Sequence, residues 1–236
     1  MLLFAIPNLI LIAAAVIPAL ALMLYVYKAD RLDKEPGALL IMLIMKGIVA
    51  TALAVWAERV GVRILGSFLD EDSLLYRILF NFLVVGLAEE GFKYLLLKRH
   101  TWSIPDFDCQ FDAVVYAVFV SLGFALWENI EYVVFYGFGT ALVRAVTAIP
   151  GHACFGVFMG AWYGLAKAHD RKGHAESSRI CRWMALICPL LLHGLYDFIA
   201  TINQNSSTVI FIAFIALMFF AAYKTIHHLS RQDQYL

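Results

Sequence analysis

Three ionisable side chains stand in a stretch that is otherwise apolar enough to cross a bilayer. Glu89, Glu90 and Lys93 lie in an apolar run over about residues 74–97. A charged side chain at mid-membrane costs about 2.5–3.5 kcal/mol on insertion scales, so three together need partners, a water-filled cavity or both. At helical spacing Lys93 is one turn from each glutamate and is expected to neutralise only one at a time. The other carboxylate is then available as a general base or proton carrier. The alternative is an ion pair between helices that only fixes their packing.

Further polar groups interrupt three other apolar runs: Glu128 in the first, His152 in the second, and His193 with Asp197 in the third. Two histidines and a carboxylate are a common ligand set of catalytic zinc, in which the fourth position is left to water. Another carboxylate beside that water can serve as general base. These residues therefore indicate metal-assisted peptide hydrolysis, with parts from four helices. The single-helix solution, His-Glu-x-x-His, is absent.

The composition places the chain in a membrane. Hydrophobic residues make up 62% of the 236 residues and charged residues 15%, and the mean hydropathy is +0.78. Soluble domains have about 45–50% apolar and about 25% charged residues. The net charge is zero, so no overall field attracts nucleic acid. We expect one integral membrane domain over residues 1–236, embedded in the lipid bilayer.

The hydropathy pattern predicts an all-α polytopic bundle of about seven transmembrane helices. The expected spans are residues 3–27, 39–56, 74–97, 111–135, 141–166, 180–202 and 209–224. Residues 58–73 carry charges of both signs and are expected to form a short helix on the membrane surface. Lysine and arginine gather in alternate loops and in the C-terminal tail, whereas the opposite loops hold little beyond Arg59 and Arg63. The positive-inside rule then places the N-terminus outside and the C-terminus in the cytosol.

The polar segments resemble, in order, the motifs of the PrsW family of intramembrane proteases, within the wider CAAX-prenyl-endopeptidase-like (CPBP/Abi) group. The matching segments are D-R-L-D-K-E-P at 30–36, E-E-G-F-K at 89–93, F-A-L-W-E-N at 124–129, P-G-H-A at 150–153 and H-G-L-Y-D-F at 193–198. CAAX-type enzymes carry histidine at the position of Glu128 and often asparagine at that of Asp197. The two extra carboxylates favour metal binding here.

The resemblance implies an endopeptidase that cuts a membrane-anchored protein, such as an anti-sigma factor, near the outer side of the bilayer. It also implies a multi-pass protein of a bacterial or archaeal plasma membrane. In that setting we expect Glu89 to activate water, and Glu90, paired with Lys93, to support the site. These two roles are exchangeable, because the two side chains point about 100° apart on a helix.

The expected metal is Zn²⁺, bound by Glu128, His152 and His193. Asp197 is one turn from His193 and is expected either to join the metal or to orient the histidine. Asn129, next to Glu128, is a candidate for polarising the scissile carbonyl.

Two other classes of function remain open for the same buried groups. One is a non-proteolytic scaffold, since the wider group includes the scaffold subunit of gamma-secretase. The other is a proton-coupled transporter, because intramembrane Glu, His and Asp side chains also serve proton relays. The sequence shows no internal repeat linking its halves, a feature that transporters often have.

Overall fold

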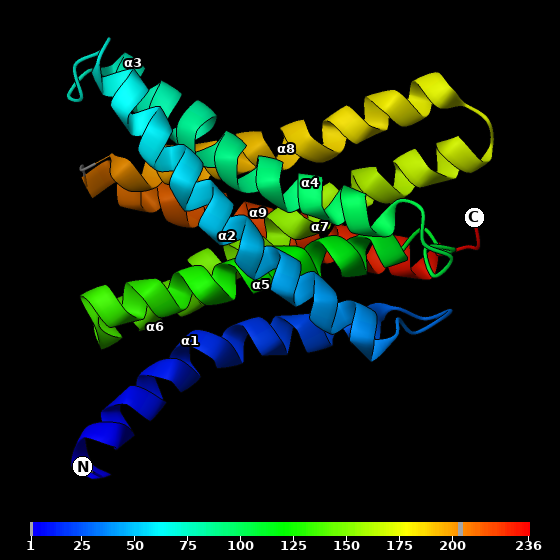
Figure 1. Ribbon diagram of the computed structural model, residues 1–236, viewed down its shortest axis with the longest axis horizontal. Coiled ribbons are helices and arrows are strands. Elements are labelled where there is room, and N and C mark those ends of the chain that lie inside the picture. Colours follow the sequence, from blue (N-terminus) through cyan, green and yellow to red (C-terminus); the bar gives the residue numbers. More distant parts are fainter. Residues whose placement is uncertain (1, 203–204) are drawn as a thin grey trace.

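The computed structural model describes residues 2–202 and 205–236, and these residues form an all-helical bundle (Figure 1). The β-structure in the described part is a single bridge between Cys109 and Tyr235. The predicted all-α class is confirmed. The helices are α1 (Leu2–Ala29), α2 (Gly37–Gly66), α3 (Leu74–Leu79), the π-helix η1 (Phe80–Gly86), α4 (Leu87–Thr101), α5 (Asp112–Tyr136), α6 (Phe138–Val146), α7 (Ala148–Arg171), α8 (Ala175–Thr201) and α9 (Asn205–Arg231).

Helix α5 is the centre of the bundle. Every residue from Asp112 to Ala125 is buried, and the most extensive packing of α5 is against α7 and α2. A helix that is apolar on all sides is suited to this position, because neighbouring helices cover each of its faces. Helix α5 therefore fixes the positions of α2, which precedes it in the sequence, and of α7, which follows it. The polar groups of both helices are placed by this packing.

Glycines allow the backbones of these helices to approach closely. A Cβ atom at Gly47 of α2 would lie 2.1 Å from the carbonyl oxygen of Val120 on α5. A Cβ atom at Gly160 of α7 would lie 2.5 Å from the Cα atom of Val114. Small residues at such crossings are typical of helix packing in membranes, where van der Waals contact replaces the hydrophobic effect as the driving force.

Helix α2 extends beyond its apolar part. The expectation of a separate surface helix over residues 58–73 is wrong, because α2 continues without a break to Gly66. No proline interrupts this stretch, and hydrogen bonding propagates through polar residues as readily as through apolar ones. As a result Glu58 belongs to a bundle helix.

The helix expected over residues 141–166 is two helices. Helix α6 ends at Val146, Thr147 takes φ −119° and ψ −66°, and α7 begins at Ala148. Pro150 then lies in the first turn of α7. An N–H group in this turn would have no intrahelical acceptor, so proline costs the helix no hydrogen bond there. The break places His152 near the start of α7.

Within residues 2–202 and 205–236, five segments are long and apolar enough to cross a membrane. They are α2, α5, residues 142–171, α8 and residues 208–231. Residues 74–101 also form one uninterrupted helical rod of α3, η1 and α4, whose charged residues lower its hydropathy. The count of seven crossings and the orientation of the termini stay predictions.

The crossing of α2 and α5 gives a test of the packing. We expect Gly47→Ala to lower the free energy of unfolding by about 1–3 kcal/mol, because the added methyl group overlaps the backbone of α5. Gly37→Ala, on the same helix, is the control, since its Cβ would have no neighbour within 4 Å. Denaturant unfolding in detergent micelles measures both. Equal losses in the two variants would contradict the close approach.

Candidate active site

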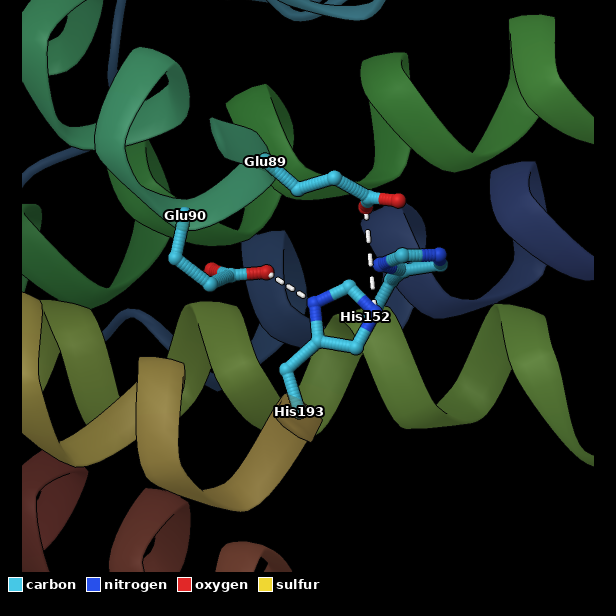
Figure 2. A group of neighbouring side chains, drawn as sticks. All are labelled: Glu89, Glu90, His152 and His193. Carbon is cyan, nitrogen blue, oxygen red and sulfur yellow. Dashed lines mark hydrogen bonds and ion pairs between the residues drawn. The ribbon is translucent and has the colours of Figure 1, made fainter. Parts of the chain in front are cut away.

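Polar side chains from α4, α7 and α8 converge inside the bundle. Figure 2 shows Glu89 and Glu90 of α4 facing His152 of α7 and His193 of α8. All four are buried, and one ligand atom from each lies within 4.8 Å of the others. Residues that are up to 104 positions apart in the sequence therefore form one group.

Close packing of the π-helix η1 against α8 brings the site residues of α4 and α8 together. Gly194 of α8 packs so closely on η1 that a Cβ there would lie 2.6 Å from Cδ1 of Phe82. Gly86, at the end of η1, likewise faces the backbone of α8, with the Leu190 carbonyl oxygen 3.2 Å from a Cβ built on it. Short π-helical segments occur frequently at functional sites. The contact brings His193 directly beside the first turn of α4.

Lys93 contacts both glutamates at once. Its Nζ atom lies 2.8 Å from Oε1 of Glu90 and 3.2 Å from Oε2 of Glu89. It is also 3.1 Å from Nδ1 of His152 and 3.8 Å from the ring centroid of Phe124. Both carboxylates reach the same ammonium group, although its single charge can neutralise only one of them. The single ammonium group of Lys93 therefore contacts two carboxylates and a histidine.

His193 lies among three carboxyl groups. Its Nδ1 atom is 2.9 Å from Oε1 of Glu90, while its Nε2 atom is 3.4 Å from Oδ2 of Asp197 and 3.8 Å from Oε2 of Glu89. The ring also stacks on Phe155, with 4.7 Å between the centroids. These contacts fix the plane of the imidazole and point its two nitrogens in different directions.

Glu128 joins α5 to this group through two contacts. Its Oε2 atom is 2.9 Å from Nε2 of His152 and 2.9 Å from Nη2 of Arg144. The Nε atom of Arg144 in turn donates to Oδ1 of Asn129, at 3.1 Å. Arg144 was not predicted as a site residue, because in the sequence it only begins an apolar run. Its position beside Glu128 depends on the break between α6 and α7.

A cavity of about 430 Å³ opens beside these residues. Its wall includes Glu89, Glu128, His152, His193 and Asp197, together with Phe124 and Phe155. Glu90 and Lys93 are fully buried and lie behind this wall. Glu89 thus faces the cavity, whereas Glu90 lies behind its wall.

The cavity wall also holds Glu58, which the sequence argument missed. Glu58 was assigned to a surface segment, and only the continuation of α2 brings it here. Five acidic residues line the cavity, including Glu131, and the basic residues in contact with the group are Lys93 and Arg144. Glu89 is buried and the other four are half-buried, so this excess of acid favours the binding of protons or of a metal cation.

Removal of the shared ammonium group gives a direct test of this arrangement. We expect Lys93→Met to destabilise the fold by about 3–5 kcal/mol, because two buried carboxylates lose their cation. The double variant Lys93→Met, Glu90→Gln should recover part of that loss, whereas Lys98→Met, in the last turn of the same helix, should have little effect. Unfolding in detergent compares the three. A Lys93→Met variant as stable as Lys98→Met would show that the ion pairs are not needed.

Comparison with known proteins agrees with the geometry. Residues 35–223 match the family model described as PrsW family intramembrane metalloprotease. Protease PrsW of Oceanobacillus iheyensis is 33% identical over 224 residues, covering 95% of this chain and 96% of that protein. Protease PrsW of Bacillus subtilis is 33% identical over 198 residues, covering 83% and 84%. No solved structure matches.

The family match spans every residue of the site described above, from Glu58 on α2 to Asp197 on α8. The metalloprotease class implies a metal ion and a protein substrate, and the buried histidines and carboxylates are groups that can bind such an ion. Relatives that align over almost their whole length carry the same name. The chain is therefore a membrane protein that belongs to the PrsW family of intramembrane metalloproteases.

Proposed function

We propose that this protease hydrolyses a peptide bond of a membrane-anchored protein in the cavity, with Glu89 as the general base. The observation that carries the proposal is the convergence of two glutamates and two histidines, within 4.8 Å of one another, beside a polar cavity of about 430 Å³. Burial of such groups in a membrane helix bundle is costly, and packing alone does not require it.

We assign Zn²⁺ to Glu128, His152 and His193, of which Glu128 lies outside the group of four and adjoins it through its contact with His152. Imidazole and carboxylate groups suit zinc, and an orphaned buried oxygen, Oε2 of Glu90, adds to the need for a cation nearby. When bound, zinc lowers the pKa of a water molecule and polarises a carbonyl group.

The hydrogen bonds of the two histidines determine which ring nitrogen carries a proton and which can bind zinc. Lys93 donates to Nδ1 of His152 in this structure, so Nε2 carries the proton and donates to Glu128. For Nε2 to offer a lone pair, Nδ1 must take the proton, and Lys93 must then donate to the two glutamates alone. His193 is already arranged for ligation, because its Nδ1 can donate to Glu90 while Nε2 remains available.

The two glutamates take different roles in this proposal. Glu89 lines the cavity and can accept the proton of an attacking water molecule. Glu90 lies behind the wall and orients His193. Since Glu90 occupies Nδ1 of His193, Asp197 faces the same nitrogen, Nε2, that we assign to zinc. This favours Asp197 as an additional ligand over a role in orienting the ring.

Asn129 is a positioning residue in this proposal. It is fully buried, and its Oδ1 accepts from Arg144, which pairs with Glu128. We infer that this arrangement supports the metal-binding carboxylate, and the contact of Asn129 with the scissile carbonyl stays a prediction.

The biological setting extends the same proposal. We infer a single protease domain over residues 1–236, spanning a bacterial plasma membrane several times with the C-terminus in the cytosol. An anti-sigma factor with one transmembrane segment is the proposed substrate, and kinship with the CAAX-type group is proposed from the shared motifs.

Metal content and cleavage, measured together, test the assignment. We expect about one zinc per chain in protein purified without chelator. Glu89→Gln should keep the zinc and lose about 10²–10⁴-fold of the cleavage rate on a tagged single-span anti-sigma factor, because the general base is gone. His152→Ala should lose the zinc.

The control is His174→Ala, since His174 is exposed in the turn between α7 and α8 and should retain both metal and activity. Elemental analysis and cleavage in liposomes are the measurements. Wild-type protein without metal would remove zinc from the proposal, and full activity of Glu89→Gln would remove the base.

A further inference from the structure

A second cavity, lined by basic and aromatic side chains, lies between α4 and α8. Its volume is about 330 Å³. Helix α4 ends and helix α8 begins at the same end of the bundle, toward the right in Figure 1. We call this space the α4–α8 cavity, and it is separate from the active-site cavity. Its lining residues are Tyr94 and Lys98 of α4 and Arg179, Arg182, Trp183 and Leu186 of α8.

Helical spacing brings these side chains onto the facing sides of the two helices. Tyr94 and Lys98 are four residues apart on α4. Arg179, Arg182 and Leu186 follow one another at spacings of three and four residues on α8. Residues at such spacings share one face of a helix. In each helix the basic residues lie nearer the end of the bundle, so the cavity has cations toward that end and apolar side chains toward the middle.

The three cations of the α4–α8 cavity have no acidic partner. No acidic residue lines the cavity, and within the part of the chain that the structure describes none of the three cations forms an ion pair. This holds even for Arg179 and Glu176, which are one turn apart on α8. Arg182 lies over the indole ring of Trp102, with its guanidinium carbon 5.2 Å from the centroid, a contact that holds the cation in place. Three positive charges are therefore available to an anion.

The aromatic residues of the cavity are typical of the boundary between lipid and water. Trp183 is 60% exposed, and the hydroxyl group of Tyr94 has no hydrogen-bond partner among the described residues. Tryptophan and tyrosine are enriched at the level of the lipid headgroups. Helix α8 is long and apolar enough to cross a membrane, and Arg179 and Arg182 lie near its start. Basic side chains near the end of such a helix extend toward the headgroups.

We propose that the α4–α8 cavity binds the headgroup of an anionic phospholipid of the surrounding membrane. Guanidinium groups bind phosphate oxygens through paired hydrogen bonds, and an ammonium group adds a point charge. Basic pockets between transmembrane helices bind anionic headgroups in this way. The acyl chains would lie along Trp183 and Leu186, which a free phosphate ion would leave uncovered. The lipid would join α4 and α8, the two helices that bring Glu90 to His193, and would stabilise their contact.

Lipid binding by the purified full chain tests the proposal. We expect native mass spectrometry from detergent to show one phosphatidylglycerol bound per chain, at concentrations at which phosphatidylcholine with the same acyl chains does not bind. Arg179→Gln combined with Arg182→Gln should weaken the binding of phosphatidylglycerol about tenfold or more, because each basic residue attracts the anionic headgroup. The control is Arg171→Gln combined with Lys172→Gln. It removes two exposed charges outside the cavity and should leave the affinity nearly unchanged.

Three results would overturn the proposal. Equal losses in the two double variants would show that binding follows only the overall charge at this end of the bundle. Equal affinity for phosphatidylglycerol and phosphatidylcholine would show that the charge of the headgroup is not recognised. Displacement of phosphatidylglycerol by an equal concentration of inorganic phosphate would show that the ligand is a free anion.

Photo-crosslinking of the wild-type protein decides the question if the arginine variants do not fold. A phosphatidylglycerol that carries a diazirine in its headgroup should label residues 94–102 and 179–186, as located by mass spectrometry of the digested protein. Labelling that misses both segments, or that is spread evenly over the chain, would reject the proposal. Cleavage activity enters none of these measurements, so the proposed catalytic function is tested separately.

Discussion

The buried ammonium group of Lys93 is the interaction on which the rest of the site depends. It is fully buried and contacts two carboxylates of its own helix and a histidine of α7. Through Glu90 it is also linked to His193 of α8. Charges at membrane depth are tolerated only where partners compensate for lost hydration. One cation therefore decides how closely three helices can bring their polar side chains.

A second cation organises the opposite side of the cavity. Arg144 pairs with Glu128 and lies over the ring of Tyr132, 3.8 Å from its centroid. Glu128 then reaches His152 from the side opposite Lys93. His152 is thus held between a lysine on one nitrogen and a carboxylate on the other. This arrangement sets which nitrogen carries the proton, and hence which nitrogen is available to a metal.

The close packing around α5 makes these contacts possible. Glycines at the crossings with α2 and α7 let backbones meet where larger residues would hold them apart. The polar groups of α2, α4, α5, α6, α7 and α8 can then share a cavity of about 430 Å³.

The sequence by itself determined the helical class, the membrane setting, the family motifs and most residues of the site. Those features follow from local hydropathy and from ionisable groups placed where water is scarce. Only the tertiary structure decided that Lys93 serves both glutamates, that Glu90 lies behind the wall and Glu89 on it, and that Glu58 and Arg144 join the site. The break at Thr147 and the uninterrupted course of α2 were also decided there. These outcomes depend on where helices cross and which side chains share one cavity, and helical periodicity within a single segment does not contain that information.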